Sequence, residues 1–84
     1  RDSFNPHTTI AFEIPRPEVV SLRVFDLSGH VVRNLMVSES RTSGRHELVW
    51  NGRDDAGKRA ASGAYFFRLE AGVFGETKRM VLIK

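Results

Sequence analysis

The sequence contains no cysteine, only one tryptophan, one tyrosine and three prolines among its 84 residues. The absence of cysteine excludes disulfide bonds, thiolate catalysis and zinc sites built on thiolates. No apolar run approaches the roughly 18 residues that a membrane-spanning helix needs, so we expect no membrane insertion. No segment sustains a 3.6-residue apolar period either, so the pattern favours a fold made of strands.

The excess of positive over negative charge is also small. The chain has 13 basic and 10 acidic residues, a net charge of +3, and no run of Lys or Arg longer than two. A nucleic-acid-binding domain generally carries a basic patch or stripe, so we expect no nucleic-acid partner. His7, His30 and His46 lie in separate segments without metal-ligand spacing, and no nucleophile stands beside a base. We therefore expect no metal, no cofactor and no enzymatic activity.

Period-two alternation of apolar residues recurs along the chain, with turn-forming residues between the alternating segments. This pattern is typical of an all-β sandwich, here with six or seven strands in a single domain covering residues 1–84. We expect strands over residues 8–14, 19–26, 31–36, 46–50, 64–71 and 76–84, with polar loops over 38–44 and 51–63. Trp50 is the best candidate for the centre of the core.

The apolar faces of these strands can be assigned by the same alternation. The residues expected to face inward are Ile10, Phe12, Ile14, Val20, Leu22, Val24, Tyr65, Phe67 and Leu69. His46 shares a face with Leu48 and Trp50, so we expect it to be partly buried and hydrogen-bonded.

The terminal segment leaves two arrangements open. If Met80 and Leu82 pack into the core, Val81 and Ile83 face outward, or the reverse. The strand is then either covered on both sides or presents an edge that a partner can extend by β-addition. In the second case Lys78, Arg79 and Lys84 would discourage indiscriminate pairing.

Two loops contain residue types that chemistry could use. Asp54, Asp55 and Gly57 follow a strand closely, and calcium takes six to eight oxygen ligands, but no Glu closes the loop at EF-hand spacing. Residues 26–30 (DLSGH) hold three residue types of a catalytic triad within one tight hairpin, where a relay geometry is hard to build. In both loops we favour ordinary turns, with Gly29 adopting a positive φ.

Five segments occur in an order that is typical of one known family. They are 4–6 (FNP), 20–33 (VSLRVFDLSGHVVR), 44–57 (GRHELVWNGRDDAG), 61–70 (ASGAYFFRLE) and 78–84 (KRMVLIK). Together they resemble the C-terminal sorting domain (type A) of the type IX secretion system and the closely related immunoglobulin-like domain of the flagellar hook-capping protein. The resemblance implies an immunoglobulin-like β-sandwich of about seven antiparallel strands at the end of a longer exported protein.

In the sorting family, the resemblance implies an address label that follows an upstream cargo domain in the same chain. The outer-membrane secretion machinery recognises the label after export to the periplasm, so the protein would be secreted or held at the cell surface. The positions that match the family's signal are Gly63, Tyr65, Lys78, Met80, Val81, Leu82, Ile83 and Lys84.

Three functions follow, and none of them is catalytic. The leading hypothesis is the secretion-sorting module, and the alternative is a structural domain of a flagellar hook-capping protein. The third is an accessory binding module, for carbohydrate or a surface polymer, of a secreted hydrolase. Such a module needs a row of exposed aromatics, for which Phe25, Phe66 and Phe74 are the candidates.

Overall fold

A computed structural model of the protein describes residues 7–83, and every element among them is a β-strand or a connecting loop. The strands are β1 (Thr8–Ile14), β2 (Glu18–Phe25), β3 (Val31–Arg41), β4 (Gly44–Trp50), β5 (Gly63–Ala71) and β6 (Phe74–Leu82). The described part of the chain has no helix that could span a membrane. The all-β expectation is therefore confirmed, with six strands in residues 7–83.

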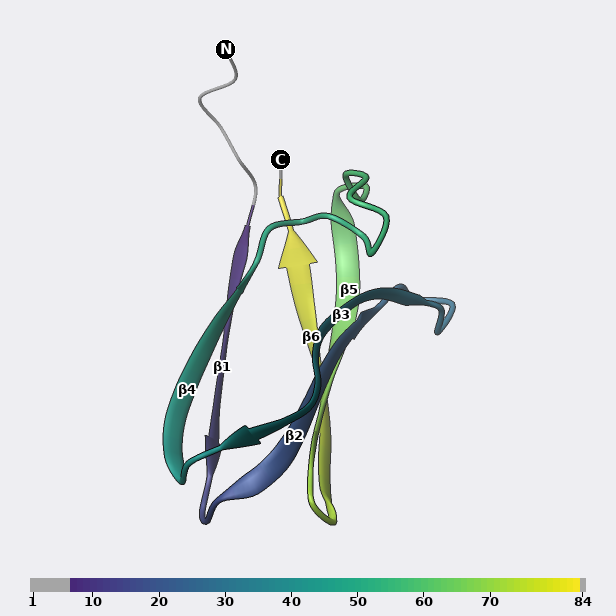
Figure 1. Ribbon diagram of the computed structural model, residues 1–84. Helices are drawn as coiled ribbons and strands as arrows, with labels where there is room; N and C mark the ends of the chain where they lie inside the picture. The colour runs from purple at the N-terminus through teal and green to yellow at the C-terminus, as the bar shows by residue number, and fades with distance from the viewer. Residues whose placement is uncertain (1–6, 84) are drawn as a thin grey trace.

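The strands form two antiparallel sheets that face each other (Figure 1). One sheet contains β1 and β4, and the other has the order β3-β2-β5-β6. The chain passes between the sheets from β1 to β2, from β3 to β4 and from β4 to β5. The first two of these connections are short, and the third is the loop over residues 51–62. This architecture places β3 and β6 at the two edges of the larger sheet.

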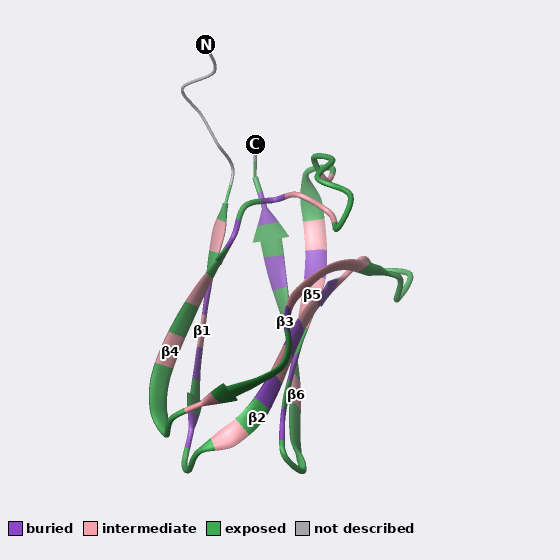
Figure 2. Ribbon diagram, viewed as in Figure 1, coloured by how far each residue is buried: buried purple, intermediate pink, exposed green. Residues whose placement is uncertain are grey.

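The core lies between the sheets and consists only of apolar side chains in the described residues. Figure 2 shows buried positions recurring along the strands of both sheets. The buried residues are Ile10, Phe12, Ile14, Val20, Leu22, Val24, Met36, Trp50, Tyr65, Leu69, Ala71, Met80 and Leu82. The inward faces expected from alternation are confirmed, except that Phe67 is only half-buried against the core. Trp50 is fully buried, as expected.

Strand β3 is longer than the sequence pattern indicates. Residues 38–41 continue the strand, although their polar composition predicts a loop. The register passes from Leu22↔Met36 to Val20↔Glu39, so β3 bulges opposite Ser21. Ser38 adopts a positive φ of 51° in this bulge, and its N–H donates to the Ser21 hydroxyl at 2.9 Å. A polar sequence is compatible with a strand here because β3 lies at an exposed sheet edge.

The last hairpin is also tighter than expected. Strand β6 begins at Phe74, and only Gly72 and Val73 separate it from β5, whereas the sequence predicts a turn over residues 72–75. Gly72 has a φ of 60°, which the first position of a type II′ turn requires. The strand ends at Leu82. Lys84, expected as its last residue, lies outside the described residues.

Candidate functional site

The residues assigned to a sorting signal fall on the β5–β6 hairpin. The register pairs Gly63 with Leu82 and Tyr65 with Met80, so residues far apart in the sequence become direct neighbours. Val81 lies opposite Ala64 in the same ladder. Lys78 lies further along β6, opposite Phe67, and is exposed. The structure thus gathers most of the predicted signal at one end of the hairpin.

The two faces of β6 differ sharply in exposure. Met80 and Leu82 are 8% and 1% exposed and contribute to the core, whereas Val81 and Ile83 are 54% and 73% exposed. Of the two arrangements left open by the sequence, the structure has the one with Met80 and Leu82 inside. The strand is therefore covered on one face only.

Strand β6 is also the last strand of its sheet. Its only hydrogen-bonded neighbour among residues 7–83 is β5, so its other edge is unpaired there. An unpaired edge presents a row of N–H and C=O groups that can accept another strand. Strand β6 therefore has the geometry that recognition by β-addition requires.

An apolar patch lies on the outer face of the same sheet. Phe25 pairs with Phe66, and Phe66 pairs with Arg79, so these three residues form one row across β2, β5 and β6. The next outward positions are Val81 on β6 and Ile83, the residue immediately after the strand. We call Phe25, Phe66, Val81 and Ile83 the outer patch; its two aromatic residues are half-buried and its two aliphatic ones exposed.

The three aromatics considered for carbohydrate binding do not form a row. Phe25 and Phe66 are neighbours, but Phe74 lies opposite Ala71 at the other end of β5. Ala71 is five positions after Phe66 along β5, a distance of roughly 17 Å at the usual strand rise. Phe74 also occupies an inward register position, whereas Phe66 occupies an outward one. The arrangement therefore lacks the aligned aromatic platform that a carbohydrate-binding face needs.

Tyr65 packs inward as expected, and it also makes a hydrogen bond that the sequence pattern does not predict. Its hydroxyl donates to the carbonyl of Ala61, and its ring packs edge-on against Trp50 with centroids 5.3 Å apart. Trp50 in turn donates its indole N–H to the Arg53 carbonyl at 2.9 Å. A tyrosine near the start of a strand that bonds a few residues upstream is the tyrosine corner of immunoglobulin-like sandwiches. Burial raises the pKa of the Tyr65 phenol above its ordinary value.

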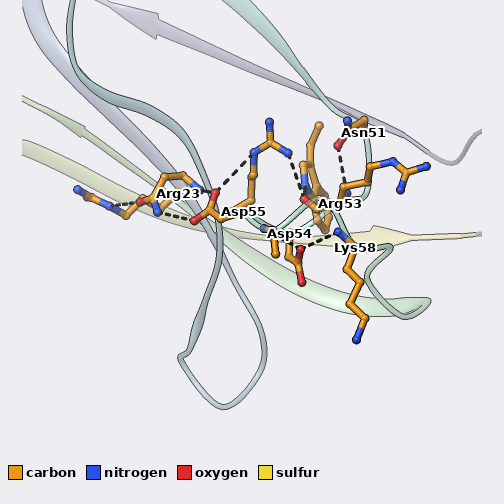
Figure 3. A network of polar contacts seen from close by, with 10 residues as sticks. Arg23, Asn51, Arg53, Asp54, Asp55 and Lys58 are labelled. Carbon is orange, nitrogen blue, oxygen red and sulfur yellow. Dashed lines mark hydrogen bonds and ion pairs between the residues drawn. The ribbon is translucent and has the colours of Figure 1, made fainter.

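Figure 3 shows how the loop over residues 51–62 is held. The Asp54 carboxylate accepts the N–H groups of Ala56 and Lys58 at 3.0 and 2.9 Å, which closes the turn. The Asp55 carboxylate accepts the N–H and the side-chain amide of Asn34 on β3, at 2.9 and 2.7 Å. These bonds hold the pKa of Asp55 below its usual range, with the Arg33 guanidinium as a minor further cause. Asp55 thereby fastens the loop to the edge of the larger sheet.

The same carboxylates border a shallow depression of about 410 Å³, to which Asp26 and Tyr65 also contribute. Each aspartate already accepts hydrogen bonds from the protein. In residues 7–83, no three His, Cys, Asp or Glu side chains are grouped so that they could hold a metal ion. The turn interpretation of Asp54 and Asp55 therefore agrees with their contacts better than the calcium interpretation.

The hairpin over residues 26–30 is likewise a turn. Asp26 accepts the N–H groups of Ser28 and His30 at 2.9 Å each, and these bonds, the one from His30 foremost, lower the pKa of Asp26. Gly29 has a φ of 90°, as expected. His30 is 80% exposed, so nothing in this loop encloses a substrate.

His46 is the histidine with a packed environment. It is half-buried, its Nε2 lies 2.7 Å from the Thr42 carbonyl, and its ring stacks on Phe12 at 5.4 Å. The expectation of a partly buried, hydrogen-bonded residue is confirmed.

Comparison with known proteins identifies relatives of this fold. The family described as "FlgD Ig-like domain" matches residues 3–73. A solved structure of FlgD from P. aeruginosa superposes with a TM-score of 0.71 at 22% identity, covering 90% of this chain and 59% of that one. FlgD from Xanthomonas campestris, described as giving insights into the hook capping essential for flagellar assembly, superposes with a TM-score of 0.70 at 22% identity. The coverage is 93% of this chain and 56% of that one. No curated protein matches the chain.

These likenesses confirm the immunoglobulin-like sandwich. The chain spans less than two thirds of the length of both solved structures, so they show its fold and not the activity of a whole protein. Of the two families in the resemblance, the comparisons support the immunoglobulin-like domain of the hook-capping protein. They give no support to the type IX sorting domain.

Proposed function

The chain belongs to the FlgD Ig-like domain family, and from this membership we propose that it is a structural, non-catalytic domain of a flagellar hook-capping protein. The observation that carries the proposal is the family match, which extends over residues 3–73 and therefore over most of the chain. The hook-capping description of the Xanthomonas relative supports the same function.

The architecture suits a supporting role. The two sheets enclose a continuous apolar core, and the buried side-chain nitrogen and oxygen atoms of the described residues all have hydrogen-bond partners. Such a core resists deformation, because packed interiors have few voids and transmit strain. The domain can therefore hold neighbouring parts of an assembly at a fixed spacing, while the outer patch offers them a contact surface.

The test is made in the bacterium that encodes the parent protein. The segment for residues 7–83 is removed from the gene, and a matched strain carries Trp50→Ala, which unfolds the domain without shortening the chain. We expect both strains to make the parent protein but to lack flagella in electron micrographs, and wild-type complementation to restore them. Normal flagellation in both strains, with the altered parent present on immunoblots, would overturn the proposal.

Sorting of an exported cargo is the second candidate, because β6 lies beyond the matched residues and has an open edge. In this function the outer-membrane secretion machinery would read Val81 and Ile83, and the parent would reach the cell surface or the medium. Deleting the end of the chain is a poor test, since Met80 and Leu82 belong to the core.

Point substitutions separate sorting from folding. Val81→Asp and Ile83→Asp change side chains that face solvent, and Val49→Asp on β4 is a control of similar exposure, 57% against 54% for Val81. Sorting predicts that the Val81 and Ile83 variants leave the parent protein in the periplasm and that the control is released. Equal release of all three variants would exclude this candidate.

A further inference from the structure

The open edge of β6 carries a residue pattern that is complementary to itself. Leu82 also faces inward, but it lies beyond residues 74–80; within that stretch of β6 the inward register positions are Phe74, Glu76, Lys78 and Met80. Read in either direction, this order is apolar, charged, charged, apolar, and reversal exchanges the acid for the base. Antiparallel strands that meet with reversed polarity would therefore bring unlike charges together.

The backbone of β6 is able to make such a pairing. Hydrogen-bonded and non-hydrogen-bonded pairs alternate along an antiparallel ladder, so every second residue of a strand directs its N–H and C=O away from its neighbour. A two-residue hairpin closes on a hydrogen-bonded pair, here Ala71 and Phe74. It follows that Gly75, Thr77 and Arg79 direct their backbone groups to the open edge.

We propose that a second copy of this chain pairs its β6 antiparallel with this edge, about a two-fold axis at Thr77. The two four-stranded sheets then join into one continuous sheet. The axis places the free backbone groups of Thr77 opposite those of the other Thr77, and Gly75 opposite Arg79. A two-fold interface uses the same patch on both copies, which this pattern satisfies.

The proposed register determines which side chains pair on each face of the joined sheet. On the inner face, Phe74 meets Met80 and Glu76 meets Lys78, each pair occurring twice. On the outer face, Thr77 meets Thr77, a favourable cross-strand pair. Arg79 meets Gly75, which has no side chain and lies opposite Glu70 in the β5 ladder. The Arg68 guanidinium already lies over Gly75 and pairs with Glu70 at 3.2 Å, so the new pairs of unlike charge lie on the inner face only.

Charge also fixes the register. A shift by two residues in either direction places Glu76 opposite Glu76 or Lys78 opposite Lys78, and like charges directly opposite are destabilising. A shift by one residue would turn the side chains to the wrong faces. Among the registers within two residues of it, only the one about Thr77 avoids both penalties, so the charges that oppose the neighbouring registers permit this one.

The space beside β6 is open in the monomer. A groove of about 290 Å³ separates β6 from the smaller sheet, and its lining is largely polar: Ala11, Phe12, Glu13, Arg45, Glu76 and Lys78. Within the strand, Glu76 and Lys78 lie 3.6 Å apart with side chains 43% and 57% exposed. Pairing of two copies would convert these two separate ion pairs into a ring of four alternating charges.

Charge reversal in pairs tests the proposal on the full 84-residue chain. Lys78→Glu and Glu76→Lys each place like charges opposite one another. Lys78 is exposed, Glu76 is half-buried, and neither belongs to the apolar core, so the monomer should remain folded by circular dichroism. We expect sedimentation equilibrium to show a concentration-dependent dimer for the wild type at up to about 1 mM and at least tenfold weaker association for each variant. Mixing the two variants should restore dimerisation, because every acid then meets a base.

Two controls define the edge as the interface. Lys58→Glu makes the same charge change in the exposed loop, and it should leave association unchanged. The double variant Glu76→Lys with Lys78→Glu keeps the self-complementary order and should dimerise as the wild type does. A wild type that stays monomeric would overturn the proposal. Variants that dimerise as strongly as the wild type would also overturn it, and would instead agree with an exchange of whole β6 strands. A mixture of the two variants that fails to associate would overturn it as well.

Discussion

Replacing Tyr65 by Phe distinguishes a structural role of this residue from a role in signalling alone. The substitution removes the hydroxyl that donates to the Ala61 carbonyl and leaves the ring against Trp50 in place. The net contribution of one such hydrogen bond is about 1 kcal/mol. Ala61 is exposed, so water can rehydrate its carbonyl and the loss stays close to that figure.

The expected shift is large enough to measure in a domain of this size. A loss of about 1 kcal/mol lowers the unfolding temperature by roughly 4–8 °C in a domain of 60–100 residues. With a urea dependence of about 1 kcal/mol per molar, the urea midpoint falls by roughly 1 M. Thr9→Val on β1 is the control, since it removes a hydroxyl from an exposed side chain. We expect the control to lie within about 0.5 kcal/mol of the wild type.

Alkaline pH gives an independent measurement of the same residue. The folded state raises the pKa of Tyr65 because burial disfavours the phenolate, so the unfolded state loses its proton first. The stabilisation is complete below the unfolded pKa of about 10 and is lost as the pH rises through the higher folded value. The wild type should lose this stability above pH 10, and Tyr65→Phe should not. A Tyr65→Phe chain that matches the wild type in both midpoint and alkaline dependence would refute the structural role.

Three further predictions concern the loops. Asp55→Asn should flatten the acid limb of the stability profile, because bonds from Asn34 lower the pKa of Asp55 from 3.8, so the wild type loses stability as the pH falls below that value. Thermal unfolding between pH 7 and pH 2 measures this, and parallel curves would contradict it. Calcium should leave the melting temperature of the wild type unchanged relative to EDTA, since the loop carboxylates already accept protein N–H groups; a calcium-dependent rise would show a site. Gly72→Ala should destabilise the hairpin by about 1–2 kcal/mol in urea titrations, because φ is 60° and the new Cβ would lie 2.5 Å from a Glu18 oxygen. Its control, Val73→Ala in the same turn, changes a fully exposed side chain and should have no comparable effect.

The parts of the fold that follow from local pattern were predictable. Alternation alone assigned Ile10, Phe12 and Ile14 to the core, because a strand with one buried face repeats every two residues. The bulge at Ser38 was not predictable in the same way, because it depends on Ser21 of the neighbouring strand. The sequence pattern predicts a turn at Gly75, and this prediction is wrong for a related reason. In the structure it lies inside β6, where the Arg68 guanidinium covers the space a side chain would fill.

The candidate site likewise has features that the sequence predicts and features that depend on long-range strand pairing. The sequence could state that either Val81 or Met80 faces outward, but only strand order shows that β6 has a free edge, and strand order depends on long-range pairing. The Tyr65 hydrogen bond could have been found from the sequence. Tyr65 lies near the start of a strand, four residues after Ala61 in the preceding loop. This is the spacing of the tyrosine corner.

Strand β6 combines two physical roles that experiments on its end tend to confuse. Its inner face contributes Met80 and Leu82 to the core, so truncation removes buried area as well as any recognition surface. Loss of two buried aliphatic side chains costs roughly 2–5 kcal/mol each, which is comparable to the whole stability expected of a small domain. A truncated chain would therefore fail in hook capping, sorting and self-association alike. Only substitutions at positions of the strand outside the core, such as Glu76, Lys78 and Val81, can assign recognition to β6 while the fold stays intact.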